Sequence, residues 1–419
     1  MPFSISKIKK CRVCENTELI PSIDIGEQYL SSVFPENLEY RKTAIKYPLN
    51  LVVCSKKKDG KTCGLIQLGH YLDLTSMYDA YPYTSSTNSS MARILQDVFE
   101  SGQVFDNVKR GDVILDIGGN DGTLLSFFKD KSLKLVNIDP AKNISPLIDF
   151  SNYVFVNDFF TKSAFRSVSK KKAKLIFSVA MFYHLNDPLK FSREVAECLD
   201  NEGAWIIQMA YLPAMIRTNM YDNIVHEHAG YYATQHVKWI MDQVGLEIFD
   251  CAENDVYGGS FRIFVKKKKN KKFTPTERYR SILDKELVEG LFVLATYQNF
   301  MNRIEKTRND LRDLCRKIKA ERKTIWVYGA STKGNTILQY CGLGHKEIAA
   351  AADSNPFKIG KYIIGSDIPI KSEEEMRAAK PDYLLALPYS FVTAFIKREA
   401  ELVAGGTKFI VPLPEVKII

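Results

Sequence analysis

Apolar runs that end in glycine turns occur twice in the sequence, and they predict two nucleotide-type folds. Residues 111–128 read GDVILDIGGNDGTLLSFF, the pattern of a buried strand, a glycine-rich turn and the start of a helix. Residues 323–341, KTIWVYGASTKGNTILQYC, repeat that order after a long helical stretch from about 276 to 320. Strands that alternate with helices in this way predict an α/β fold with Rossmann-like units.

Polar residues follow several predicted strands of the first unit. KLVNIDP ends a strand at Asp139, VFVNDFF places Asp158 and Phe159 after the next strand, and LIFSVAMFYHLNDP places His184 in an exit loop. Ligands of open α/β sheets bind outside the carboxyl ends of the strands. We therefore expect these side chains near a ligand, although a histidine at a strand end can equally satisfy a backbone carbonyl.

The glycine turn of the first unit has the spacing Asp116-x-Gly118-x-x-x-Gly122. It differs from the G-x-G-x-x-G dinucleotide fingerprint and resembles the first motif of methyltransferases that use S-adenosylmethionine. Glycines allow the backbone to approach the cofactor closely, and strand-end carboxylates can meet its ammonium group and its ribose. A purely structural turn is the alternative. The predicted cofactor-binding residues are Asp116, Gly118, Asn120, Gly122, Asp139, Asp158 and Phe159.

Two cysteine pairs near the N-terminus predict a structural zinc site. Cys11 and Cys14 form C-R-V-C, and Cys54 and Cys63 follow with eight residues between them. Thiolates close together in sequence form a knuckle, and two knuckles complete a tetrahedral four-sulfur site. The second spacing is looser than usual, and scattered free thiols are the alternative.

Length and composition limit the class of protein. A chain of 419 residues with 45% hydrophobic content can bury more than one core, so we expect several domains. The net charge is +9, but its lysine runs SKKKAK and KKKKNKK lie beside predicted strands, where such runs are solvated faces, and we expect no nucleic-acid partner. The sequence lacks an apolar run of about twenty residues and an apolar N-terminal signal segment. We therefore expect a cytoplasmic monomer without a membrane partner.

The stretch YDNIVHEHAG places His226 and His228 on either side of Glu227. Histidines two residues apart point to different faces of a helix, and the zinc protease motif H-E-x-x-H is absent. Neutral imidazole can accept a proton at neutral pH. Acid and base chemistry, a hydrogen-bonded structural patch and a metal site remain the three interpretations.

The second glycine turn does not carry the chemistry of a nucleotidase. Gly329 and Gly334 have the spacing of a phosphate-binding loop, but Asn335 and Thr336 stand where lysine and a hydroxyl residue would be needed. The missing G-x-G-x-x-G also counts against an oxidoreductase. Asp353 ends a strand much as Asp139 does. Two nucleotide-type folds suggest two ligands, a methyl donor and a nucleotide-bearing acceptor.

The ordered set of motifs resembles the sugar 3-C-methyltransferases of deoxysugar biosynthesis. The motifs run from C-x2-C and CGLIQL through YPYTSSTNSSM, LDIGGNDGTLL, YDNIVHEHAGYY and VYGGSFR to VYGASTKGNTILQYCGLG and FIVPLPEV. This resemblance implies a zinc-binding domain over 1–75, a methyltransferase domain over 76–272 and a Rossmann-like domain over 273–419. It also implies an acceptor in which dTDP or GDP carries a 4-keto-6-deoxysugar, methylated at C3.

The resemblance further implies which residues act on the sugar. Carbon methylation needs a carbanion, and the C3 proton is acidic because it lies beside the C4 ketone. His228 matches the base proposed for the family, while His226 and Glu227 could orient it or contact the substrate. The remaining candidates for catalysis are His184, Tyr81 and Tyr83.

Several motifs depart from the family pattern. The family has glutamate and serine where Asp116 and Gly119 stand here, tyrosine at the position of Val225, and histidine at that of Tyr257. Ile364–Ser366 and Leu387–Ser390 differ as well. These changes leave the sugar and its carrier open. A methyltransferase acting on oxygen or nitrogen, and an inactive module that binds nucleotide sugars, remain alternatives.

Overall fold

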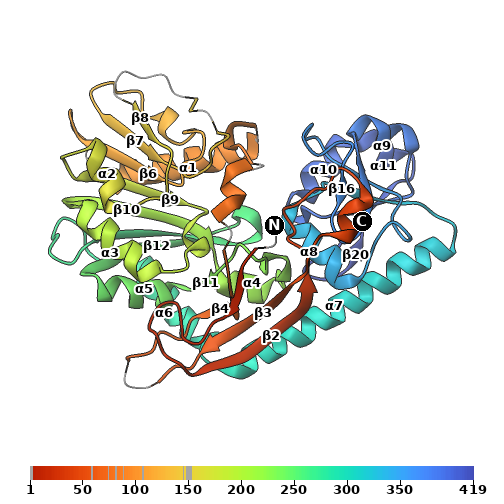
Figure 1. The fold of residues 1–419 in the computed structure, drawn as a ribbon, viewed down its shortest axis with the longest axis horizontal. Coiled ribbons are helices and arrows are strands. Elements are labelled where there is room, and N and C mark those ends of the chain that lie inside the picture. Colours follow the sequence, from red (N-terminus) through yellow and green to blue (C-terminus); the bar gives the residue numbers. More distant parts are fainter. Residues whose placement is uncertain are drawn as a thin grey trace.

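The computed structural model describes residues 3–57, 60–73, 75–80, 83–87, 89–105, 108–144, 146–147 and 153–419. Its strands form two seven-stranded sheets, a four-stranded sheet and a two-stranded sheet within these ranges. Figure 1 shows the middle and C-terminal sheets as separate lobes, with the strands β2 and β3 and the helix α7 running beneath both. The predicted α/β class, with a small N-terminal unit and two Rossmann-like units, is confirmed.

The N-terminal unit does not complete its own sheet. The strands of this unit are β1 (Ile5–Lys7), β2 (Leu19–Gln28), β3 (Tyr47–Cys54), β4 (Ile66–Leu68) and β5 (His70–Leu72). The four-stranded sheet has the order β11-β4-β3-β2, and β11 (Gly230–Tyr231) comes from the middle of the chain. An edge strand leaves its main-chain groups unpaired, and β11 pairs with those of β4. The segment expected over 1–75 is therefore joined to the residues that follow the HEH motif.

The middle sheet has the order β12-β13-β10-β9-β6-β7-β8. Its strands are β6 (Val113–Ile117), β7 (Lys134–Ile138), β8 (Tyr153–Val156), β9 (Ala173–Val179), β10 (Leu199–Ala210), β12 (Leu246–Asn254) and β13 (Ser260–Lys267). The five strands β10, β9, β6, β7 and β8 are parallel to one another. The strand β13 is antiparallel to both β10 and β12. The chain passes from β6 to β7 on one side and returns to β9 on the other. Such a reversal is where doubly wound sheets bind ligands.

Helices cover this sheet, but the one predicted directly after β6 is not an α-helix. The α-helices of the unit are α1 (Ser89–Phe105), α2 (Lys162–Val168), α3 (Pro188–Cys198), α4 (Leu212–Arg217) and α5 (Thr234–Gln243). After the glycine turn the chain forms only a short 3-10 helix, Leu125–Phe127. Phe128 leaves it in an extended conformation and packs its ring against Phe99 and Phe177 of the core.

The C-terminal unit is a second mostly parallel sheet of order β16-β17-β15-β14-β18-β19-β20. Its strands are β14 (Ile325–Tyr328), β15 (Ala350–Ala352), β16 (Tyr362–Ile363), β17 (Ile368–Lys371), β18 (Tyr383–Ala386), β19 (Lys408–Val411) and β20 (Lys417–Ile418). Its helices are α8 (Thr332–Cys341), α9 (Glu373–Ala379), α10 (Val392–Arg398) and α11 (Ala400–Ala404). The reversal of strand order falls at β14, directly before the second glycine turn.

The helix expected over 276–320 is two helices. These are α6 (Glu277–Val288) and α7 (Leu294–Ala320). Gly290 lies between them with a φ of +68°, a left-handed conformation that ends a helix and that glycine adopts at little cost. The apolar periodicity continues across the break, so it could not reveal the turn.

Residues after β2 tie the N-terminal unit to the C-terminal one. The Tyr29 amide donates to Gln339 Oε1 over 2.8 Å, and Asn335 Nδ2 donates to the Ser31 carbonyl over 3.2 Å. The Tyr362 amide donates to the Pro35 carbonyl over 2.9 Å. The N-terminal segment therefore contacts both lobes and holds them together.

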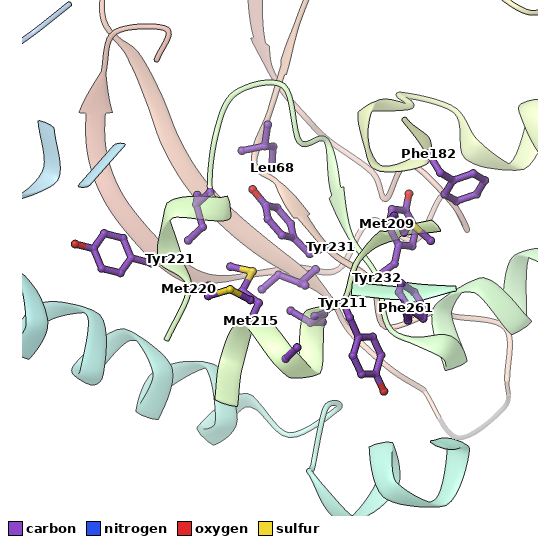
Figure 2. Close-up of a cluster of buried hydrophobic side chains, with 14 of the residues drawn as sticks. Leu68, Phe182, Met209, Tyr211, Met215, Met220, Tyr221, Tyr231, Tyr232 and Phe261 are labelled. Carbon is purple, nitrogen blue, oxygen red and sulfur yellow. The ribbon is translucent and has the colours of Figure 1, made fainter. Parts of the chain in front are cut away.

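A buried cluster of aromatic and sulfur side chains includes residues just before and just after the HEH motif. Figure 2 shows Leu68 of β4 beside Tyr231 of β11, with Met215 and Met220 below them. The Leu68 amide donates to the Ala229 carbonyl over 3.1 Å, which fixes the chain directly after the motif. No helix in the described ranges is both long enough and apolar enough to cross a membrane.

Candidate active site

The HEH motif lies in a loop where its three polar side chains point to three different elements. His226 Nε2 lies 3.1 Å from the Tyr47 carbonyl of β3, and Glu227 Oε1 accepts a hydrogen bond of 2.6 Å from Ser32 Oγ. His228 Nδ1 lies 2.8 Å from the Asn223 carbonyl. The motif is thus held by the N-terminal unit on one side and by its own preceding turn on the other.

The contact with Asn223 determines the tautomer of His228. A carbonyl oxygen can only accept a hydrogen bond, so Nδ1 of the neutral ring must carry the proton. Nε2 then has a free lone pair. Burial lowers the pKa of His228 well below its ordinary value, and the neighbouring His184 and Lys333 lower it further. His228 is therefore neutral at neutral pH and can accept a proton at Nε2.

His184 stands beside His228. The two rings are stacked, with centroids 5.4 Å apart and planes inclined by 25°. Burial lowers the pKa of His184 to about 4. Two neutral imidazoles therefore lie together where the loop after β9 meets the HEH motif.

His226 and Glu227 do not join this pair. The His226 ring packs edge-on against Tyr47, and its Nδ1 is buried with no hydrogen-bond partner among the described residues. Burial raises the pKa of Glu227, and Oε2 of this carboxyl also lacks a partner within the described ranges. Because the two histidines of the motif diverge, they do not offer a shared metal site. Among the described residues, only the four N-terminal cysteines gather enough metal-ligating side chains to hold an ion.

The tyrosine-rich loop before α1 lies only partly within the described residues. Tyr81 lies outside the described residues. The Tyr83 carbonyl accepts a hydrogen bond of 3.1 Å from Asn120 Nδ2, which places this loop beside the cofactor turn. Tyr83 also packs among the partly buried residues of the core next to Met91 and Tyr257.

Three residues at this site, Tyr183, Asp222 and Lys333, were not singled out in the sequence, and Tyr389 was named there only within the departure Leu387–Ser390. Tyr183 has its ring centroid 4.3 Å from that of His228. Asp222 lies in the turn before the motif, accepts a hydrogen bond of 3.1 Å from the Tyr389 hydroxyl, and has Lys333 Nζ 4.0 Å away. Tyr389 and Lys333 belong to the C-terminal unit, and Lys333 lies in the first turn of α8. Only the tertiary contact between lobes could reveal this group.

The departures from the family pattern fall in different places. Val225 is 2% exposed and adds no polar group to the loop. The Tyr257 hydroxyl donates to Met91 Sδ over 3.1 Å. Gly365, by contrast, lies against the N-terminal segment, where its amide donates to the Tyr40 hydroxyl over 2.8 Å. Changes at Ile364–Ser366 therefore act on the contact between terminal units.

The cofactor turn after β6 has the form expected of a ligand loop. Gly118 and Gly122 adopt φ values of +70° and +82°, which favour glycine. The Gly118 amide donates to the Ile138 carbonyl over 2.8 Å. The Asn120 amide donates to Asp139 Oδ2 over 2.8 Å. These bonds fix the predicted turn against the carboxyl end of β7.

Buried acids gather at this turn. Asp116 is 2% exposed, and burial raises its pKa to about 8, with the nearby Asp139 and Asp121 raising it further. Asn137 Oδ1 is buried beside them without a hydrogen-bond donor in the described part of the chain. A group of acids and an unpaired acceptor requires a cationic partner. The ammonium group of S-adenosylmethionine meets this requirement, so the residues fit the cofactor.

Asp158 and Phe159, two of the predicted cofactor-binding residues, lie after β8. The Phe159 amide donates to Asp158 Oδ1 over 2.7 Å, and the Phe159 ring is 44% exposed. Tyr78 meets that ring edge-on at a centroid distance of 5.4 Å. The Tyr78 hydroxyl also feels the charges of Asp139 and Glu227, which add to the effect of burial in raising its pKa to about 12. Tyr78 therefore lies between the cofactor turn and the HEH motif.

The four predicted zinc ligands come together. The sulfur atoms of Cys11 and Cys63 are 3.5 Å apart, those of Cys14 and Cys54 are 3.4 Å apart, and all four lie within 4.8 Å of one another. Tetrahedral bonds of about 2.3 Å place sulfurs roughly 3.8 Å apart. Gln67 Nε2 also donates to Cys11 Sγ over 3.1 Å, a contact that stabilises the negative charge of a metal-binding thiolate. The cluster fits a structural zinc ion.

Comparisons with known proteins agree with these three parts. A zinc-binding domain family matches residues 11–78, a methyltransferase domain family matches 84–250, and the C-methyltransferase C-terminal domain family matches 255–414. The C-methyltransferase NovU of Streptomyces niveus is 28% identical over 418 residues, which cover 99% of this chain and 98% of NovU. The chain belongs to the C-methyltransferase family. Its cofactors are S-adenosylmethionine and zinc.

Solved structures match part of this C-methyltransferase. The plantazolicin methyltransferase BpumL bound to SAH is 12% identical, covers 46% of this chain and 94% of its own, and has a TM-score of 0.34. The mitomycin 7-O-methyltransferase MmcR is 13% identical, covers 43% of this chain and 55% of its own, and has a TM-score of 0.31. The family assignment therefore rests on the sequence matches.

Proposed function

We propose that this C-methyltransferase methylates C3 of a 4-keto-6-deoxysugar carried by dTDP or GDP, with His228 as the base. The observation that carries the proposal is the hydrogen bond of 2.8 Å between His228 Nδ1 and the Asn223 carbonyl. It leaves Nε2 as the proton acceptor in a site where burial keeps the ring neutral.

The chemistry follows from this tautomer. His228 Nε2 accepts the C3 proton of the sugar, the C3–H electron pair forms a C3–C4 double bond, and the carbonyl pair moves to the C4 oxygen. When bound, S-adenosylmethionine would supply an electrophilic methyl group for C3; its S–CH3 bond would break with the electron pair left on sulfur, and the C4 carbonyl would re-form. His228 returns its proton to solvent after the product has formed. His184 is stacked on His228 and covers one face of its ring.

The C-terminal unit supports a nucleotide-linked acceptor. Lys333 approaches the site from the first turn of α8, and Asp222 is the acidic group near it, at 4.0 Å. A lysine at a helix N-terminus is suited to the negative charge of a diphosphate. The same unit repeats the cofactor turn, because the Gly329 amide donates to the Ala352 carbonyl and the Ala330 amide to Asp353 Oδ2.

Asp353 itself is already paired in this second turn. Lys358 Nζ lies 3.2 Å from Asp353 Oδ2 and donates to the Ala330 carbonyl over 3.0 Å. A ribose would have to compete with this lysine. We therefore assign Lys333, rather than Asp353, to the acceptor.

The test uses purified enzyme, S-adenosylmethionine and the dTDP- and GDP-linked 4-keto-6-deoxyhexoses. The wild-type product should gain one methyl carbon at C3 by mass and proton spectra. His228→Ala should lower turnover by roughly 10²- to 10⁴-fold, the range for a positioned general base, with unchanged affinity for the cofactor. His345→Ala changes an exposed histidine of the C-terminal unit and serves as the matched control.

Three results would contradict the proposal. Methyl transfer to oxygen or nitrogen, without loss of deuterium from C3, would show another reaction class. A His228→Ala enzyme that exchanges the C3 proton at the wild-type rate would place the base at another residue. Binding of cofactor with no turnover on any of these sugars would favour a binding module.

A further inference from the structure

Removal of the C3 proton places negative charge on the C4 oxygen, and a base alone does not stabilise that charge. Enzymes stabilise such an oxyanion with a preorganised donor in a site that excludes water. The proposed base therefore needs a donor at hydrogen-bond distance from the ketone oxygen. Val225, three residues before His228, has an apolar side chain and cannot serve, although the resembling family has a tyrosine at this position.

Tyr183 is in the right place. It follows β9 in a short 3-10 helix, Phe182–His184, directly before His184. Its ring centroid is 4.3 Å from that of His228 and 4.6 Å from that of His184. Tyr183 and His228 also line one pocket, together with Asn223 and Tyr231. Tyr183 and His228 therefore border the same space, where a donor and a base could act on neighbouring atoms of one ligand.

Three other tyrosines near Tyr183 or near the turn before the HEH motif donate their hydroxyl protons to other groups. The Tyr231 hydroxyl donates to the Asn223 carbonyl over 3.4 Å, and that of Tyr257 donates to Met91 Sδ over 3.1 Å. The Tyr389 hydroxyl donates to Asp222 Oδ1 over 3.1 Å. The Tyr183 hydroxyl makes no hydrogen bond to any of the described residues. Its proton is thus available for a ligand.

The environment keeps that proton on the oxygen. Burial raises the pKa of Tyr183 above its ordinary value, and the nearby Tyr257 and Tyr78 raise it further. The hydroxyl therefore stays protonated at neutral pH, and it does not compete with His228 as a base. A donor that stays protonated suits an oxyanion that forms and decays in each turnover.

We infer that Tyr183 is a catalytic residue whose hydroxyl donates a hydrogen bond to the C4 oxygen of the sugar while His228 removes the C3 proton. The inference rests on the proposed function and deepens it. No proton leaves Tyr183: Nε2 of His228 gains the C3 proton, the C3–H pair becomes the C3–C4 double bond, and the carbonyl pair becomes a lone pair held by the Tyr183 hydroxyl.

The test is Tyr183→Phe in the full-length enzyme. The substitution removes one oxygen that makes no hydrogen bond to the described residues, so the folded state should keep its stability. Exchange of the C3 proton with deuterated solvent, measured without the methyl donor, should slow by about 10²- to 10³-fold, the effect of losing one oxyanion donor. kcat should fall in parallel, while KM and the affinity for S-adenosylmethionine stay near their wild-type values.

Tyr71→Phe is the matched control, because this tyrosine of β5 is 39% exposed and remote in sequence from the site. It should exchange at the wild-type rate. If the wild type exchanges C3 and Tyr183→Phe exchanges as fast, the role assigned to Tyr183 is wrong while the proposed function stands. If the wild type neither exchanges nor methylates either keto sugar, the proposed function fails first.

Discussion

Replacement of Gly119 by alanine should weaken binding of S-adenosylmethionine. A Cβ atom at this position would lie 2.5 Å from Asn137 Oδ1 and 2.6 Å from Asp116 Oδ2. Both distances are far below van der Waals contact. The resembling family has serine here and glutamate at the position of Asp116, so in this chain the two departures belong together: the shorter acid occupies the space of the missing side chain.

The size of the effect follows from how firmly the neighbours are held. Asn137 lies in β7, and its Nδ2 donates to the Asn120 carbonyl over 2.8 Å. Asp116 is buried in β6 and must move instead. Overpacking of this kind costs about 1–3 kcal/mol. Since about 1.4 kcal/mol is a tenfold change in affinity, the Kd for the cofactor should rise roughly 5- to 150-fold if Asp116 is displaced.

Calorimetric titration with S-adenosylmethionine, together with the thermal midpoint of unfolding, measures both consequences. Gly405→Ala is the control, because its nearest neighbour to an added Cβ is 3.3 Å away and it lies in the C-terminal unit. The control should bind the cofactor as the wild type does. A Gly119→Ala enzyme with wild-type Kd and unchanged thermal midpoint would refute the placement of Asp116 and Asn137 against this glycine.

Two further predictions concern the metal and pH. Elemental analysis should find one zinc per chain. The double variant Cys14→Ser with Cys63→Ser should lose the zinc and unfold the sheet that holds β11, whereas the control Cys198→Ala should keep the zinc. Zinc retained in the double variant would exclude the cysteine cluster as its site. Burial lowers the pKa of His226 to about 4, so the folded state resists protonation and wild-type stability should fall as pH drops below the unfolded value of about 6.5. Glutamine at position 226 cannot be protonated, so the difference in thermal midpoint between wild type and His226→Gln at pH 7.5 should be smaller at pH 5. An equal difference in thermal midpoint at both pH values would contradict this.

Patterns local in sequence were sufficient for much of the chemistry. Strand, turn and strand-end acid lie within short stretches, so the Asp116 to Gly122 turn and Asp139 could be recognised and do meet at the carboxyl ends of β6 and β7. The two cysteine pairs could also be recognised from their spacing in the sequence. That Cys11 and Cys63 meet across 52 residues depends on the pairing of β2, β3 and β4. Apolar periodicity failed at Gly290, because a left-handed turn interrupts a helix without interrupting the pattern.

The composition of the catalytic site was decided by the tertiary structure. Tyr183 next to His228, and Lys333 and Tyr389 next to Asp222, are contacts between segments separated by 45 to 167 residues. No periodicity relates such residues, since each segment satisfies only its own strand or helix. The HEH motif likewise gave three interpretations from sequence, and only the Tyr47 carbonyl, Ser32 and the Asn223 carbonyl separate its three side chains. Hydrogen-bond direction, which depends on the folded neighbours, is what makes His228 Nε2 the free base.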